Sequence, residues 1–410
     1  MGPTFSRPPW RAAGLVLLAL YLAAGAIYSF VVTPQLRFTD ETKYLELSHN
    51  LLHGPGYSLD GVHLTAARPP GYPFFLATIE ATGGGGSAMR FAQFILLGAT
   101  VLLVSRLGPG SDRPAGLLIV TVLVALYPVL FYLSGTLYPQ THAGFLFVLA
   151  LTFLTAPTRG PGLNLATGLA FGLLILVVPT FTLTLIVVLA AAWMLRLIRW
   201  RDGFLVLAGA SLFIGLWTAR NAVEFHQFVP LASNSGANLL IGNCENTVPD
   251  GGTGNIDSSR YDREATALGL DEFQRDRYYR NAALAWIENN PGRATLLYFE
   301  KAANYFNIYN EYAPSNQAEI TPWKQILMAA SYLLLLGLLA WRLAESKRFP
   351  LTPREKLFLL VYVLSAFTMA IFVTRIRYRL PYDFLVIAVV AAHLERRLRP
   401  WLEPTPTKPT

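Results

Sequence analysis

The chain has 410 residues, of which 53% are hydrophobic and only 14% are charged, and its mean hydropathy is +0.40. Soluble globular proteins carry about 25% charged residues, so this composition excludes an ordinary soluble domain. The net charge of +8 does not require a nucleic-acid partner, because the cytoplasmic loops of membrane proteins are also rich in Lys and Arg. We expect no nucleic-acid binding.

Apolar runs close to the length of about 20 residues that a membrane span requires recur along the chain. They predict an all-α polytopic membrane protein with about ten transmembrane helices. Pro179 divides an apolar stretch that is too long for one span. The expected spans cover approximately residues 12–33, 88–106, 114–133, 141–156, 163–178, 183–198, 203–219, 323–343, 356–374 and 380–395.

The distribution of basic residues orients these spans. Arg7 and Arg11 precede the first run, which we interpret as a retained signal anchor. Basic residues recur in every second connection, whereas the short connections at 134–140 and 179–182 contain none. The positive-inside rule therefore predicts a multi-pass protein of the cell (inner) membrane with both termini in the cytoplasm.

Two longer segments are predicted on the extracytoplasmic side. The first, 34–87, contains amphipathic stretches at 40–53 and 71–82 and ends in a glycine run that we expect to be a flexible joint. The second, 220–322, ends in amphipathic helices, one of which begins at Pro291 and is expected on the membrane surface. The expected organisation is a transmembrane module at 1–219 that includes the 34–87 loop, an extracytoplasmic loop at 220–322, C-terminal transmembrane helices at 323–400 and a disordered tail at 401–410.

Charged residues gather at the predicted outer face. Asp40 and Glu41 directly follow the first span, with Lys43 close behind. A carboxylate at this position can act as a general base toward an acceptor hydroxyl. Capping of the following helix, with Asp40 as the N-cap, explains the same residues equally well.

Three arginines, Arg375, Arg377 and Arg379, crowd the short outer turn before the last span. Such charges are costly next to lipid unless an anion compensates them, and guanidinium groups suit phosphate. We interpret the turn as a lipid-phosphate clamp in preference to general headgroup contact. Arg68 is a further candidate, because the prolines and glycine that follow it predict a rigid turn; the alternative is a solvated arginine.

Amides and histidines supply weaker signals. Arg220, Asn221, Asn234, Asn238 and Asn243 lie near the membrane surface and suit carbohydrate hydroxyls. His49 and His53 have the spacing of metal ligands on a helix, with His63 nearby. We favour the simpler interpretation of polar residues on a solvated face, so we assign no metal site and expect no required cofactor, although a divalent metal is possible.

These pieces together resemble the GT-C superfamily of membrane glycosyltransferases, in particular the bacterial branch related to protein O-mannosyltransferases (family 39) and to the lipid A aminoarabinose transferase. The resemblance spans residues 38–383 in the family's order. Its motifs are Asp40-Glu41-x-x-Tyr44, Asn50-Leu51-Leu52-x-Gly54-x-Gly56-Tyr57, Arg68-Pro69-Pro70-Gly71-Tyr72-Pro73, Arg220-Asn221 with Phe225 through Gly242, Trp286-x-x-x-Asn290-Pro291, and Arg377-Tyr378-Arg379-Leu380-Pro381.

The resemblance implies a GT-C fold and inverting transfer of a sugar from a polyprenyl-phosphate donor to a glycan, lipid or protein acceptor at the outer face. It implies catalysis by Asp40, with Glu41 sharing that role or holding structure. Lys43, Arg68, Tyr72, Arg375, Arg377, Tyr378 and Arg379 would bind the donor phosphate. Two positions depart from the family: Gln140 stands where many relatives carry an acid, and Val178 where many carry an arginine.

Two other functions fit a membrane protein of this composition. A lipid transporter or flippase would place ionisable groups within its spans, whereas the polar residues here gather at the outer face. A noncatalytic subunit with the same fold is the other alternative, which the presence of Asp40 disfavours.

Overall fold

The structure is a computed structural model that describes residues 9–32, 35–108, 115–249, 260–308 and 322–402. These residues fold almost entirely into helices, and the one extended pairing among them is an isolated bridge between Ser58 and Leu64. The predicted all-α class is therefore confirmed.

Helices occupy all ten predicted spans. One of these spans is a bent pair, α5 and α6, whose axes differ by 78°; the bend lies where Pro128 begins a new helix. The helices are α1 (Pro9–Ile27, continued by a π-helical turn at Tyr28–Val32), α4 (Gly86–Val104), α5 (Gly116–Ala125), α6 (Pro128–Ser134), α7 (Gln140–Leu154), α8 (Pro161–Val177), α9 (Phe181–Met194), α10 (Trp200–Phe225), α15 (Pro322–Ala344), α16 (Pro353–Ala370) and α17 (Ile376–Leu402).

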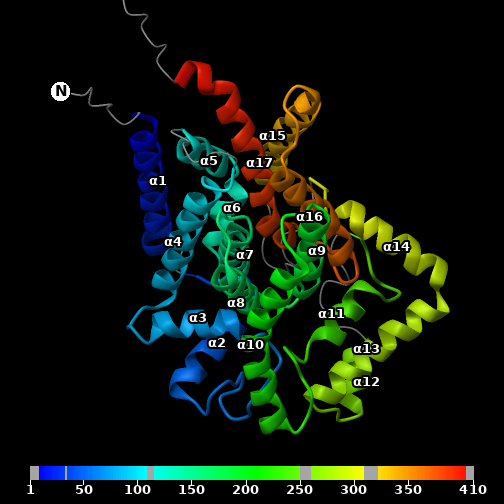
Figure 1. Ribbon diagram of the computed structural model, residues 1–410. Coiled ribbons are helices and arrows are strands. Elements are labelled where there is room, and N and C mark those ends of the chain that lie inside the picture. The colour runs from blue at the N-terminus through cyan, green and yellow to red at the C-terminus, as the bar shows by residue number, and fades with distance from the viewer. Residues whose placement is uncertain (1–8, 33–34, 109–114, 250–259, 309–321, 403–410) are drawn as a thin grey trace, which may run out of the picture.

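Amphipathic and shorter helices form the two segments predicted outside the membrane. These are α2 (Thr39–His53), α3 (Gly71–Glu80), α11 (Ser235–Gly242), α12 (Arg260–Ala267), α13 (Glu272–Asn289) and α14 (Pro291–Asn304). In Figure 1, α2, α3, α12 and α13 lie at the end of the molecule opposite to the beginning of α1 and the end of α17. This arrangement is the one expected if both described chain ends lie on one membrane side and the long loops on the other.

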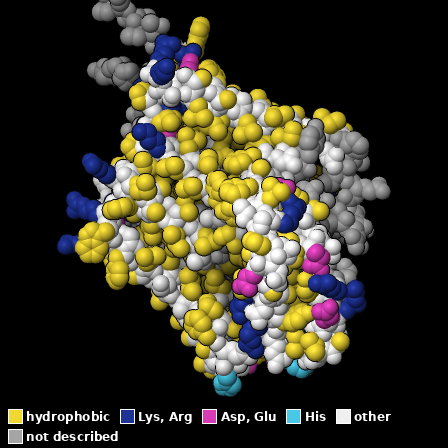
Figure 2. All heavy atoms as spheres, turned by 90° about the vertical axis from the view of Figure 1, so that its right-hand side faces the viewer, with side chains coloured by type: hydrophobic (Ala, Val, Ile, Leu, Met, Phe, Trp, Pro, Cys, Tyr) yellow, Lys and Arg dark blue, Asp and Glu magenta, His cyan; other side chains and the backbone are white. Residues whose placement is uncertain are grey.

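Four helices of the described chain are long and apolar enough to cross a membrane, at Trp10–Val32, Gly86–Val104, Trp200–Phe225 and Trp323–Lys347, and the bent pair makes a fifth if it is one span. Helices α7, α8 and α9 are apolar but shorter. The face in Figure 2 is broadly hydrophobic, with charged side chains near its upper and lower ends, along its left edge and at a few places on its right half. A large exposed apolar area of this kind is typical of a surface in contact with lipid. The protein is a membrane protein, and the figure of ten spans stays a prediction.

Proline and capping residues set several helix ends, and the two at Pro179 and Pro291 are those that the sequence predicted. Helix α8 ends before Pro179 and α9 begins after it. Pro291 opens α14 at its first turn, and Thr352 caps α16 by accepting from the Glu355 amide. The predicted tail at 401–410 lies mostly outside the described residues, although Trp401 still belongs to α17. The main apolar core lies among α4, α5, α7, α8, α9, α16 and α17.

Helices α8 and α10 approach each other through glycines. A Cβ atom at Gly168 would overlap the carbonyl oxygen of Val206, and one at Gly209 would lie 2.6 Å from the Leu165 oxygen. Small residues allow membrane helices to pack backbone against backbone, which stabilises them by close van der Waals contact. Helix α10 thereby carries the second outer segment on a fixed support.

We expect Gly168→Ala to lower the free energy of unfolding by about 1–3 kcal/mol, because the methyl group forces α8 and α10 apart. The thermal midpoint of the detergent-solubilised protein measures this loss. Gly215→Ala on α10 is the matched control, since a Cβ there meets open space. Equal midpoints for the two variants would show that the close approach does not matter.

Candidate active site

Helices α2 and α3 lie side by side and run in the same direction. The contacts between α2 and the segment formed by α3 and the turn before it follow the same order along both segments. Parallel helices place both positive N-terminal dipole ends at one end of the pair, which favours anions there. The contacts, in order, are Asp40 with Arg68 (Oδ1–Nη2, 2.8 Å), the rings of Tyr44 and Tyr72 (centroids 5.1 Å apart), and Ser48 with Glu80 (Oγ–Oε2, 2.8 Å).

The turn before α3 holds Arg68 in place. The Tyr57 hydroxyl donates to the carbonyl oxygens of Arg68 and Pro69, at 3.0 and 3.1 Å. A Cβ at Gly71 would lie 2.8 Å from the backbone of Leu176 in α8, so only glycine permits this approach. The rigid turn predicted from the Arg-Pro-Pro-Gly sequence is therefore present, and it fixes Arg68 next to Asp40.

Asp40 joins residues from three distant parts of the chain. Besides the 2.8 Å contact with Arg68, its Oδ2 atom lies 3.4 Å from the Tyr138 hydroxyl and 3.9 Å from Nη1 of Arg377. The side chains of Asp40 and Arg68 keep 28% and 23% of their accessible surface, so a ligand can reach them. The predicted convergence of an acid with arginines from opposite ends of the chain is present.

Electrostatics keep the Asp40 carboxyl ionised. Burial raises its pKa, but Arg68, Arg377 and Lys43 outweigh that effect, and the net pKa lies below the ordinary value of 3.8. Lys43 is half-buried one turn along α2, where its positive charge adds to that of the two arginines. At neutral pH the site therefore holds a carboxylate in a surplus of positive charge.

Arg377 is buried but incompletely satisfied. Its Nη2 atom donates to the Tyr378 hydroxyl at 3.0 Å, and its guanidinium carbon lies 4.6 Å from the centre of the Tyr138 ring. Its Nε and Nη1 atoms find no hydrogen-bond acceptor among the described residues. Buried donors are rarely left without acceptors, so this arginine is suited to an anionic ligand. Burial raises the pKa of the Tyr378 phenol, yet Arg377 and Arg375 bring it below its ordinary value, as positive charge around the phenol requires.

Arg379 does not join this cluster. Its side chain is fully buried, contacts Asp383 at 3.3 Å and donates to the backbone oxygens of Tyr305 and Asn307. Residues two apart on a helix point about 200° apart, so Arg377 faces Asp40 while Arg379 faces the core. The predicted phosphate contact of Arg379 is not supported by this geometry. Arg375 is also buried at the start of the turn, and its predicted role stays a prediction.

Glu41 has a structural position. Its Oε2 atom accepts from the backbone amides of Arg37 and Phe38 at 2.6 and 2.8 Å, and its Oε1 atom accepts from the Leu137 amide at 2.8 Å. Glu41 thus closes the start of α2, the capping role that we considered for Asp40. Asp40 is instead the second residue of the helix, which leaves its carboxylate free for the arginines.

Tyr72 and several predicted sugar-binding residues are used inside the protein. The Tyr72 hydroxyl donates to Gln93 at 3.2 Å within the core. Arg220 donates to the Thr65 oxygen and to Asn221, which in turn donates to the Val229 oxygen. Asn234 precedes α11, and the Asn238 amide donates back to its backbone oxygen at 2.9 Å. These hydrogen bonds lie in the core, between loops and at the start of α11, and none of them reaches Asp40.

Helix α14 supports the arginine turn from behind. Buried Lys301 donates to the backbone oxygens of Phe372 and Gly242 at 2.9 and 2.7 Å and to Oδ1 of Asn243 at 3.2 Å. Burial lowers the pKa of Lys301 to about 8. Asn304 donates to the Thr374 oxygen at 3.0 Å. Asn243, predicted to bind sugar, is thus part of this support.

Sequence reasoning missed one residue of the site, Tyr138. Its hydroxyl points at Asp40 and its ring contacts both Arg377 and Phe38. Tyr138 could have been predicted from its position in a short outer turn directly before Pro139. From the sequence we considered only Gln140 in that turn.

We expect Arg379→Ala to lower the free energy of unfolding by about 3–5 kcal/mol, because it leaves Asp383 buried without its partner. Arg377→Ala should cost clearly less, since Asp40 keeps Arg68. Thermal midpoints of both variants in detergent check this order, and the reverse order would contradict the assignment of Arg379 to the core.

The lowered pKa of Asp40 predicts a pH-dependent contribution to stability. A carboxyl whose pKa is lower in the folded chain stabilises the fold at pH values above its unfolded pKa, and this contribution is lost as the pH falls through the folded pKa. The difference in thermal midpoint between the parent and Asp40→Asn should therefore be constant near neutral pH and shrink below pH 3.8. A difference that grows on acidification would refute the ion pairing.

No protein-family model matches the chain, and no curated protein matches its sequence. The apo oligosaccharyltransferase of Archaeoglobus fulgidus matches in structure with a TM-score of 0.56 and 16% identity, over 97% of this chain and 52% of that one. This chain thus spans about half the length of the archaeal protein.

Two further structures match less closely. ArnT from Cupriavidus metallidurans, bound to undecaprenyl phosphate, has a TM-score of 0.45 and 14% identity over 94% of this chain and 78% of its own. The A. fulgidus protein AglB, in complex with an inhibitory peptide and a dolichol-phosphate, has a TM-score of 0.47 and 16% identity over 97% and 52%. The likeness to the apo oligosaccharyltransferase, together with the helical architecture, shows that the chain has the GT-C fold that its motifs predicted.

Proposed function

We propose that the protein is an inverting glycosyltransferase that moves a sugar from a polyprenyl-phosphate donor to an acceptor hydroxyl at the extracytoplasmic membrane face. The observation that carries the proposal is the pairing of an ionised, accessible Asp40 with a buried Arg377 whose Nε and Nη1 lack acceptors among the described residues. A base and an anion-binding group thus lie side by side. The described GT-C fold and the oligosaccharyltransferase it resembles support the same reaction class.

The donor phosphate would lie against Arg377 and Arg68, with Lys43 adding positive charge. Breaking the bond between the anomeric carbon and the phosphate oxygen leaves both electrons on that oxygen. Fixed guanidinium groups stabilise the charge as it develops, and they need no reorganisation at that moment. Helix α3 adds the positive end of its dipole behind Arg68.

Asp40 would accept the proton of the acceptor hydroxyl as that oxygen attacks the anomeric carbon from the face opposite the phosphate. Arg68 occupies Oδ1 at 2.8 Å, whereas the neighbours of Oδ2 lie at 3.4 and 3.9 Å. Oδ2 is therefore the oxygen that a hydroxyl can approach. A carboxylate of low pKa is a weak base, so the proton would move late, when the attacking oxygen has become acidic.

We expect Asp40→Asn to reduce sugar transfer by about 10²–10⁴-fold, the usual contribution of a general base, with little loss of donor binding. The measurement is transfer from a radiolabelled polyprenyl-phosphate sugar to a total membrane extract, with donor binding followed by filter retention. Asp60→Asn is the matched control, because Asp60 is an exposed carboxylate of the same segment that pairs with His63.

The same assay separates the alternatives. Full transfer by Asp40→Asn would remove Asp40 from catalysis. A flippase would move the labelled donor across vesicles without consuming it, and a noncatalytic subunit would bind it without either effect. Arg377→Ala should weaken donor binding, which is the opposite pattern to Asp40→Asn.

A further inference from the structure

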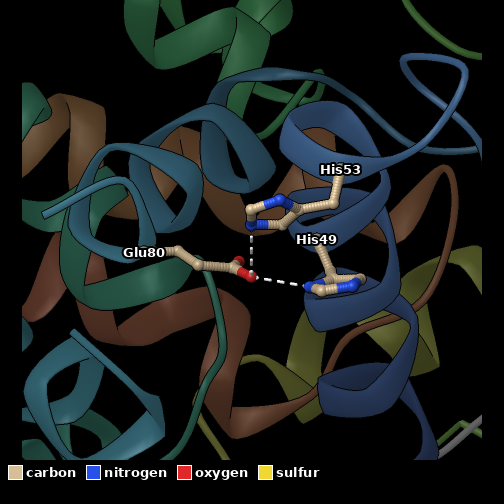
Figure 3. Close-up of side chains that lie close together, drawn as sticks. All are labelled: His49, His53 and Glu80. Atoms are coloured by element: carbon tan, nitrogen blue, oxygen red, sulfur yellow. Dashed lines mark hydrogen bonds and ion pairs between the residues drawn. The ribbon is translucent and has the colours of Figure 1, made fainter. Parts of the chain in front are cut away.

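A second cluster lies at the other end of the parallel helices α2 and α3. His49 and His53 occupy successive turns of α2, and Glu80 is the last residue of α3. Figure 3 shows both imidazoles directed at the same carboxylate oxygen: His49 Nδ1 lies 2.8 Å and His53 Nε2 3.9 Å from Oε1 of Glu80. One nitrogen from each ring and this oxygen all lie within 4.8 Å of one another.

A hydrogen bond fixes the orientation of the Glu80 carboxylate. Buried Ser48 donates to Oε2 of Glu80 at 2.8 Å, which turns Oε1 toward the histidines. A hydrogen bond of this kind orients metal-binding carboxylates in known sites. The histidine side chains are 62% and 60% exposed and that of Glu80 21%, so an ion can enter without displacing core residues.

A simple ion pair explains only part of this geometry. His49 alone satisfies Oε1 of Glu80 through the 2.8 Å contact. His53, at 3.9 Å, is too far for a hydrogen bond, yet its ring packs 4.8 Å from that of His49 and faces the same oxygen. A single cation bound between the two rings and the carboxylate would use all three groups.

The separations between the candidate ligand atoms can be compared with those in a zinc site. Zinc ligands lie about 2.0–2.2 Å from the ion, so two ligands of a tetrahedral site are about 3.3–3.6 Å apart. The two separations from Oε1 of Glu80, 2.8 and 3.9 Å, bracket this value. All three candidate ligand atoms lie within 4.8 Å of one another, so rotation of the exposed imidazoles must bring the two rings closer to the ion. Imidazole nitrogens favour zinc over calcium or magnesium, which prefer oxygen ligands.

We propose that His49, His53 and Glu80 bind one Zn²⁺ ion, with a water molecule as the fourth ligand. The site fixes the parallel alignment of α2 and α3, whose opposite end carries Asp40 and Arg68. His49 is nine residues from Asp40, or about 14 Å along the helix. The ion is therefore a structural clamp and is too far away to touch the reacting atoms. This proposal does not depend on the proposed function.

The test uses the full chain in detergent with its affinity tag removed. After equilibration with micromolar free Zn²⁺, the parent should hold one more zinc per chain than H49A/H53A, measured by atomic emission. Isothermal titration should show at least about a 100-fold loss of affinity in that variant. The matched control is H63A, since His63 lies in the connection from α2 to α3 but pairs with Asp60 instead, and it should bind zinc like the parent.

Thermal melting gives a second measurement. The midpoint should rise with Zn²⁺ in the parent and in H63A, because a ligand that binds only the folded state stabilises it, and should not rise in H49A/H53A. Equal zinc contents in parent and double variant, or no zinc bound to the parent, would overturn the proposal. If the double variant fails to fold, the visible spectrum of the parent with added Co²⁺ tests the proposal instead. Ligand-field bands that disappear when stoichiometric zinc is added support the site, and the absence of such bands overturns it.

Discussion

The candidate site of this protein depends on one carboxylate that is shared by two guanidinium groups. Asp40 contacts Arg68 at 2.8 Å and Arg377 at 3.9 Å, so residues separated by most of the chain meet at one side chain. Near lipid, neither arginine is stable without a negative partner. A single carboxylate between two positive groups leaves a surplus of positive charge, and this surplus makes the site attractive to a phosphate.

Charged residues that are neighbours in one motif have different roles: one contacts the candidate site and the other stabilises the fold. Arg377 and Arg379 are two residues apart, yet the first reaches the site and the second forms a fully buried pair with Asp383. Asp40 and Glu41 are adjacent, yet Asp40 contacts arginines, whereas Glu41 accepts hydrogen bonds from three backbone amides. In both pairs one residue fixes the backbone from which the other acts, so the supporting residue is as necessary to the site as the exposed one.

The parallel helices α2 and α3 link the two clusters of the first outer segment. Their contacts follow the same order from Asp40–Arg68 at one end, through Tyr44–Tyr72, to Ser48–Glu80 at the other. A shift of one helix along the other would separate the Asp40 carboxylate from Arg68. The proposed zinc ion opposes that shift at the far end, where the exposed histidines contribute little packing.

From the amino-acid sequence alone we could predict the membrane scaffold and the charged residues of the site, but not Tyr138. Apolar runs, Pro179 and Pro291 predicted helices that the structure confirms, because span length and helix ends follow from local rules. Motif order indicated Asp40, Arg68 and the arginine turn. The tertiary structure alone decided that Arg379 faces the core, that Tyr138 contacts Asp40, that the amides from Asn221 to Asn243 hold loops, and that Glu80 joins His49 and His53 while His63 does not. These outcomes depend on which helix faces meet, and contacts between helices distant in sequence leave no periodic pattern from which they can be deduced.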